Sequence, residues 1–120
     1  MKIYFYTQDF LLPSHPDSYP GSLQPIPQGL YTVGSLEWAG SRGDYSAAFS
    51  SAIGPFWVAI TATFGDDRGA FGFHMDHNYT SSPGSAGCVV FQSLSVARLF
   101  VELFNDPRSR PRKLRVDWGI

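Results

Sequence analysis

Glycine and proline divide this chain into short segments, and that limits the folds it can adopt. The 120 residues include 12 glycines and 9 prolines, and both residue types are unfavourable inside helices and central strands. Aromatic residues make up 16% of the chain, and they favour the packed surfaces of sheets. A chain of this length forms one domain with a real core. The sequence therefore predicts a single β-rich domain spanning residues 1–120.

Six short runs have the composition or alternation of strands. They are residues 2–10, 30–38, 55–64, 70–75, 88–91 and 114–118. The turn signal GDDRG at 65–69 predicts a hairpin between the third and fourth of these runs. Residues 11–29 hold five prolines and two glycines, which predicts an ordered surface loop and excludes a helix or a central strand.

Helical periodicity occurs late in the chain, in residues 93–106. The apolar positions with helical spacing are Val96, Leu99, Phe100, Leu103 and Phe104. Ser93 or Ser95 is suited to cap the N-terminus of this helix, and Asn105-Asp106-Pro107 to end it. The predicted fold class is therefore mainly β, a β-rich α+β domain with one helix after the only cysteine.

Composition and charge exclude several functions. The net charge of −1 predicts no nucleic-acid partner and no anionic membrane surface. No apolar run approaches the roughly 20 residues that cross a bilayer, and nothing predicts a cofactor. The N-terminus lacks the apolar core of a secretory signal, so we expect synthesis in the cytoplasm and arrival elsewhere by release or another route.

Five of the nine basic residues lie in 108–115, either as a solvated connector or as a patch for an anionic polymer.

The only cysteine, Cys88, follows a run of small residues in a segment that also holds two of the three histidines. Residues 72–91 read GFHMDHNYTSSPGSAGCVVF. A cysteine nucleophile needs a base, donors for an oxyanion and room for a substrate. His74 or His77 can supply the base. Sharp backbone turns that aim N–H groups at an oxyanion are available to the small residues Gly84, Ser85 and Gly87.

Each of these residues also has a purely structural interpretation. Cys88 can be a core residue opening the run CVVF. His77 can be a solvated turn residue, and His74 a satisfied, partly buried histidine. With Asp76, the two histidines and the cysteine could ligate zinc, but structural zinc sites usually repeat a tight pair such as Cys-x₂-Cys. The chain has no such pair, so we predict no metal.

The order of these residues resembles the active-site segment of the L,D-transpeptidase catalytic domain, the YkuD-like family of cell-wall enzymes. That family has an upstream histidine, a glycine-containing loop and a [Ser/Thr]-His-Gly-Cys motif. The corresponding residues here are His74, the run SSPG, and Ser85-Ala86-Gly87-Cys88. The chain differs at Ala86, where the family has its motif histidine, and at Val90, where Asn or Arg is common.

The resemblance extends over roughly residues 25–118. IPQGLYTVG at 26–34 is similar to the family's Thr-Pro-x-Gly-x-Phe/Tyr-x-Ile segment, and GPFWVAI at 54–60 is similar to the strand before its histidine. A helix and then a strand follow the cysteine in both. The resemblance implies a YkuD-like sheet, sandwich or barrel-like in form, with one helix after the catalytic cysteine.

The resemblance also implies an activity and a partner, peptidoglycan. Cys88 attacks the carbonyl of a diaminopimelate–D-amino acid bond in a stem peptide, and His74 serves as base and then acid. The N–H groups of Gly87 and Cys88 form the oxyanion hole. Supporting roles fall to Ser85 and Asp76, and to the neighbouring His77, Gly84 and Ala86.

The acyl-enzyme then passes to water or to an amine. The absence of a signal sequence favours hydrolysis, as in a phage lysis enzyme. The alternative is a non-catalytic cell-wall-binding or phage-particle structural module with Cys88 buried.

Overall fold

The strands of this domain form one eight-stranded sheet, and a helix lies between the last two of them in the chain. The computed structural model describes residues 26–49, 53–65, 71–75, 89–91 and 93–117, and gives three N-terminal strands by their backbone. In chain order the elements are β1 Lys2–Thr7, β2 Phe10–Leu12, β3 Ser18–Pro20, β4 Gly29–Trp38, β5 Phe56–Ala62, β6 Phe71–Met75, β7 Val89–Phe91, α1 Leu94–Glu102 with a 3₁₀ turn Leu103–Asn105, and β8 Lys113–Asp117. The prediction of a β-rich domain with one helix after the cysteine agrees with these elements.

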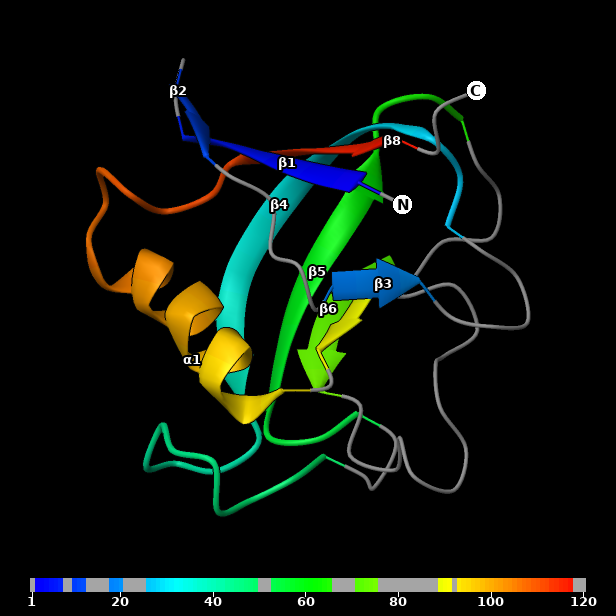
Figure 1. Ribbon diagram of the computed structural model, residues 1–120. Coiled ribbons are helices and arrows are strands. Elements are labelled where there is room, and N and C mark those ends of the chain that lie inside the picture. The colour runs from blue at the N-terminus through cyan, green and yellow to red at the C-terminus, as the bar shows by residue number, and fades with distance from the viewer. Residues whose placement is uncertain are drawn as a thin grey trace.

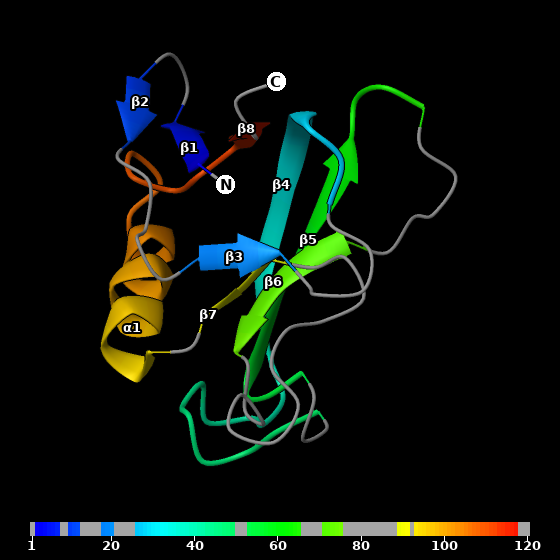
Figure 2. The same cartoon turned by 45° about the vertical axis from the view of Figure 1, so that its right-hand side comes forward.

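The sheet is mixed and curls into a half-barrel (Figure 1). Its strand order is β2-β1-β8-β4-β5-β6-β7-β3. Neighbouring strands are antiparallel except β6 and β7, which run parallel. The turned view shows α1 on one side, with β4, β5 and β6 beside one another (Figure 2). The predicted hairpin is confirmed, because β5 and β6 pair antiparallel.

The core lies between α1 and the inner face of the curl. Alternate side chains of β4, β5, β6, β7 and β8 fill it, among them Tyr31, Val33, Phe56, Val58, Phe73, Phe91, Leu114 and Val116. The helix contributes Ala97, Phe100 and Val101. Burying this apolar surface is the main favourable term in folding.

The predicted helix is confirmed, with one correction to its buried face. The side chain of Ser93 accepts a hydrogen bond from the backbone N–H of Val96 and caps the N-terminus, and the helical segment ends at Asn105. Leu99 was expected on the buried face, but it is 58% exposed. The buried positions Ala97, Phe100 and Val101 centre the apolar stripe about 150° away from Leu99.

The N-terminal region contains more strand than the sequence predicted. The run 2–10 divides into β1 and β2, and the expected surface loop 11–29 contains β3 and the end of β2. Both β2 and β3 lie at the ends of the strand order. Pro20 belongs to β3 and pairs with Val89, which is possible because an edge strand has one side where the missing N–H is not needed. The exclusion of a central strand was therefore correct.

A bulge in β4 reverses which residues face the core. Val33 pairs with Ile60 and Leu36 with Val58, so β4 has one residue more than β5 over this interval. Before the bulge the odd-numbered residues of β4 face the core, and after it Leu36 and Trp38 pack there. Glu37 therefore lies on the outer face of the sheet.

Candidate active site

Four residues form a row across the outer face of the sheet. Glu37 on β4 pairs with Trp57 on β5, the rings of Trp57 and His74 on β6 stack, and His74 pairs with Val90 on β7. Every residue of β6 and β7 is buried, whereas the outward-facing Glu37 is exposed and Trp57 half-buried. The row therefore runs from a covered part of the outer face to an open part.

His74 is the one buried polar or charged side chain among the described residues, at 4% exposure. Its Nδ1 lies 2.9 Å from the backbone oxygen of Met75. A carbonyl oxygen only accepts hydrogen bonds, so Nδ1 carries the hydrogen and donates it. In a neutral ring this tautomer has its lone pair at Nε2, the arrangement that a general base requires.

Trp57 holds the histidine ring in place from the neighbouring strand. The two ring centroids are 5.8 Å apart and the planes differ by 20°. The indole also lies over Gly72, because a Cβ built on Gly72 would approach within 2.5 Å of the Trp57 ring. The absence of a side chain at Gly72 is therefore what lets the Trp57 ring lie over β6 beside His74.

Gly72→Ala is expected to displace Trp57 and lower the free energy of unfolding by about 1–3 kcal/mol, the usual cost of overpacking. Gly65→Ala is the matched control, since a Cβ there meets no atom within 4 Å. Urea unfolding and tryptophan emission of both variants test this. A Gly72→Ala protein with wild-type stability and emission would contradict the packing described.

Trp57 also forms one wall of a hollow on the open part of the outer face. The described lining consists of Glu37, Phe49, Ile53 and Trp57, and the volume is about 220 Å³. Three of these side chains are apolar, and Glu37 supplies one carboxylate. The hollow and the histidine therefore share the Trp57 indole as a common boundary.

The loop that carries Phe49 is anchored to the core. Tyr45 packs edge-on against Trp38 at 5.2 Å and Phe56 at 6.3 Å, and Arg98 lies over its ring. Burial raises the pKa of the Tyr45 hydroxyl. The backbone N–H of Phe49 donates to the oxygen of Gly54 at 2.9 Å. These contacts hold the described residues on either side of Phe49 against the sheet.

Most residues predicted for the site lie outside the described part of the chain. Among the sequence candidates His74 is described, and the structure places it beside Val90. The others, outside the described residues, are Asp76, His77, Gly84, Ser85, Ala86, Gly87 and Cys88. In the described part, no three His, Cys, Asp or Glu side chains are placed to hold a metal ion.

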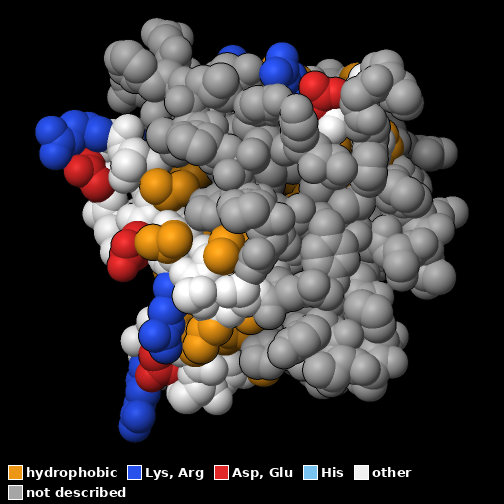
Figure 3. Space-filling model, viewed as in Figure 1, with side chains coloured by type: hydrophobic (Ala, Val, Ile, Leu, Met, Phe, Trp, Pro, Cys, Tyr) orange, Lys and Arg blue, Asp and Glu red, His pale blue; other side chains and the backbone are white. Residues whose placement is uncertain are grey.

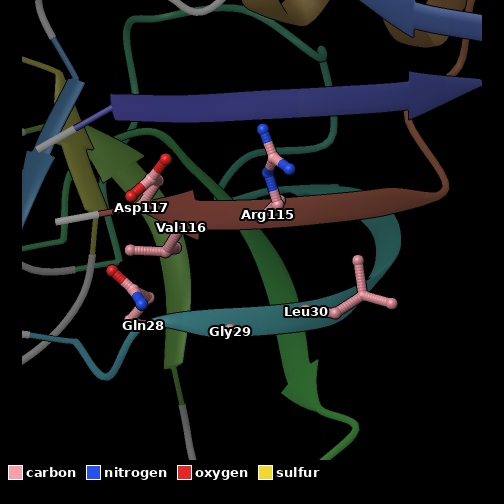
Figure 4. A pocket seen from close by; sticks show the side chains of 6 residues that line it. All are labelled: Gln28, Gly29, Leu30, Arg115, Val116 and Asp117. Atoms are coloured by element: carbon pink, nitrogen blue, oxygen red, sulfur yellow. The ribbon is translucent and has the colours of Figure 1, made fainter. Parts of the chain in front are cut away.

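A second hollow lies at the other end of β4 (Figure 4). It has a volume of about 280 Å³, and its described lining consists of Gln28, Gly29, Leu30, Arg115, Val116 and Asp117. Leu30 and Glu37 are seven residues apart on one strand, so the two hollows are separated by about 20 Å. This described lining includes none of the residues predicted for the cysteine site.

Two basic residues of the C-terminal connector, Arg108 and Arg110, form separate contacts. Arg108 pairs with Asp106 at 3.0 Å, and hydrogen bonds from Arg108 lower the pKa of that carboxyl. Arg110 donates to Ser35. On the face seen in Figure 3, the Lys and Arg side chains are dispersed, with acidic side chains beside them. This arrangement favours a solvated connector over an anion-binding patch.

Within the part of the chain that the structure describes, no helix has the length and apolarity to cross a bilayer. This finding concerns α1 and the 3₁₀ turn after it.

Two members of the row were not recognised from the sequence. Neither Trp57 nor Glu37 was singled out as a candidate site residue. One signal was available for Glu37: the apolar alternation shifts phase between Tyr31 and Val33 and then Leu36 and Trp38. Comparisons with protein-family models, with curated proteins and with solved structures gave no significant match. The likeness to the L,D-transpeptidase family therefore depends on the sequence motifs alone.

Proposed function

We propose that this chain is a cysteine-dependent enzyme of peptidoglycan stem peptides that acts through an acyl-enzyme at Cys88. Its target is an L,D-type bond between diaminopimelate and a D-amino acid. The observation that carries the proposal is the parallel pairing of β6 and β7, which sets His74 directly opposite Val90. Cys88 precedes Val90 by two residues in the chain.

The pairing supports a contact between the histidine and the cysteine. Residues two apart in a strand face the same side of a sheet, and Val90 shares the outer face with His74. Cys88 lies outside the described residues, two positions before Val90 in the chain, and the proposal requires that its thiol reach the His74 ring.

The tautomer of His74 fits the first half of the reaction. Nε2 takes the proton from the thiol, and the thiolate attacks the carbonyl carbon, forming a C–S bond. The C–N bond to the D-amino acid then breaks, and the proton on Nε2 moves to the leaving amine. By resemblance to the family, the N–H groups of Gly87 and Cys88 stabilise the oxyanion.

The second half of the reaction regenerates the thiol. Water or an amine loses a proton to Nε2 and attacks the thioester carbon, and the C–S bond breaks. Water gives net hydrolysis and an amine gives exchange. The Met75 carbonyl keeps the donor at Nδ1 through both halves, so Nε2 is the nitrogen that gains and loses the proton.

Digestion of purified diaminopimelate-type sacculi tests the proposal. We expect the protein to release or exchange D-amino acids, detected as new muropeptide masses, and the masses distinguish hydrolysis from exchange. Because Cys88 is the only cysteine, protein alkylated with iodoacetamide is a matched control and should be inactive. The thiol should also alkylate in the folded state at neutral pH.

A second pair of results would contradict the proposed enzyme. Sacculi of several chemotypes left unchanged, together with a thiol that reacts only in denaturant, would establish the non-catalytic binding or structural module.

A further inference from the structure

We infer that the hollow formed by Glu37, Phe49, Ile53 and Trp57 binds the alkylammonium side chain of the diamino acid in the stem peptide. The identity of this ligand rests on the proposed function. The chemistry of the hollow rests on its own residues, which combine apolar walls with one carboxylate.

The walls suit an aliphatic chain. Phe49 is 50% exposed, and together with Ile53 and Trp57 it gives the hollow three apolar surfaces beside solvent. An alkyl stem gains free energy by leaving water for such a surface. Its charged end stays near the opening. The Trp57 ring adds a face that attracts cations.

The Glu37 carboxylate favours a positively charged ligand. Glu37 is exposed and directly opposite Trp57 in the register of β4 and β5. Among the described residues no cation pairs with the Glu37 carboxylate, and no described basic side chain lines the hollow. The described lining therefore favours an ammonium group over a neutral amide, and the carboxylate that diaminopimelate carries beside its ammonium group stays in solvent outside the hollow.

The position of the hollow fits the acyl half of the substrate. Glu37 lies two strands from His74, which corresponds to about 10 Å across the sheet. The sheet places Val90, which follows Cys88 by two residues in the chain, on the opposite side of His74 from Trp57. A diamino acid whose carbonyl is attacked beside His74 can thus direct its side chain over Trp57 to Glu37.

Peptide binding to the Cys88→Ala protein tests this inference without requiring turnover. The probes are L-Ala–γ-D-Glu–L-Lys–D-Ala and the same peptide with an acetylated lysine side chain. We expect the lysine peptide to bind about fivefold more tightly, the range of one exposed ion pair. Adding Glu37→Gln should remove that difference by weakening the lysine peptide alone, and about 0.5 M NaCl should reduce it.

Glu102→Gln is the matched control, because it removes the same charge from an exposed position on α1, whose buried side chains pack into the core. It should leave both affinities unchanged.

Three results would overturn the inference. They are equal affinity for the two peptides, an equal effect of Glu37→Gln on both, and no binding of the lysine peptide. Binding that depends on Glu37 in a protein that leaves sacculi unchanged contradicts the proposed function and not the subsite. Digestion of sacculi without dependence on Glu37 contradicts the subsite alone.

Discussion

Cys88→Ala is expected to abolish release of D-amino acids from sacculi, and His74→Asn to lower it by about 10²–10⁴-fold, the usual contribution of a general acid–base. The alanine variant has no atom to form the acyl-enzyme. In the histidine variant, the asparagine amide keeps a donor near the position of Nδ1, so the hydrogen bond to the Met75 carbonyl has a replacement. The amide has no basic nitrogen to take the proton of the thiol. Initial rates of product release, measured by mass, give both effects.

The same histidine variant separates catalysis from structure. His74 is buried and stacked on Trp57, so a loss of activity could reflect unfolding. Far-UV circular dichroism and the urea midpoint report whether His74→Asn is folded. In folded protein, alkylation of Cys88 at neutral pH should become slower, because the thiolate loses its partner. A folded His74→Asn protein with wild-type rates of digestion and alkylation would refute the pairing of the two residues.

Phe100→Ala is expected to lower the free energy of unfolding by about 3–5 kcal/mol, the cost of truncating a buried aromatic side chain. Phe100 is fully buried, with ring centroids 4.8 Å from Phe73 and 4.9 Å from Phe91. Those two residues belong to the strands that carry His74 and Val90. Domains are stable by only about 5–15 kcal/mol, so the loss is a large fraction of the total. Urea unfolding measures it.

Leu99→Ala provides the matched control on the same helix. Leu99 is 58% exposed, so its truncation should change stability by only about 0.5 kcal/mol. Phe100→Leu extends the test if the alanine variant does not fold, and it should cost less than the alanine change. A Phe100→Leu protein with an unchanged urea midpoint, or equal losses at positions 99 and 100, would contradict the core described here.

The sequence predicted the elements whose signals are local. The helix of α1 followed from apolar spacing and from Ser93, which caps it as expected. The β5–β6 hairpin followed from an alternating run and a turn signal. The strands β2 and β3 were missed because pairing with β1 and β7 overrides the local preference of a proline-rich segment. Such pairing depends on residues distant in the chain.

The candidate site was predicted only in part, for a similar reason. Sequence motifs selected His74 and Cys88 because their chemistry is visible in their residue types. Trp57 and Glu37 could be assigned to the row only from the strand register. A one-residue bulge in β4 decides which side of the sheet Glu37 occupies.

The sequence by itself determined a β-rich domain and its late helix, and it suggested the pairing of one thiol with a nearby histidine as a hypothesis to test. Periodicity, capping and residue type are local properties, and each can be identified within a few positions. The tertiary structure decided that β6 and β7 run parallel, that His74 faces away from the core against Trp57, and that Glu37 completes the row beside a hollow. Those facts depend on strand register between distant segments, which is selected by packing of the whole core.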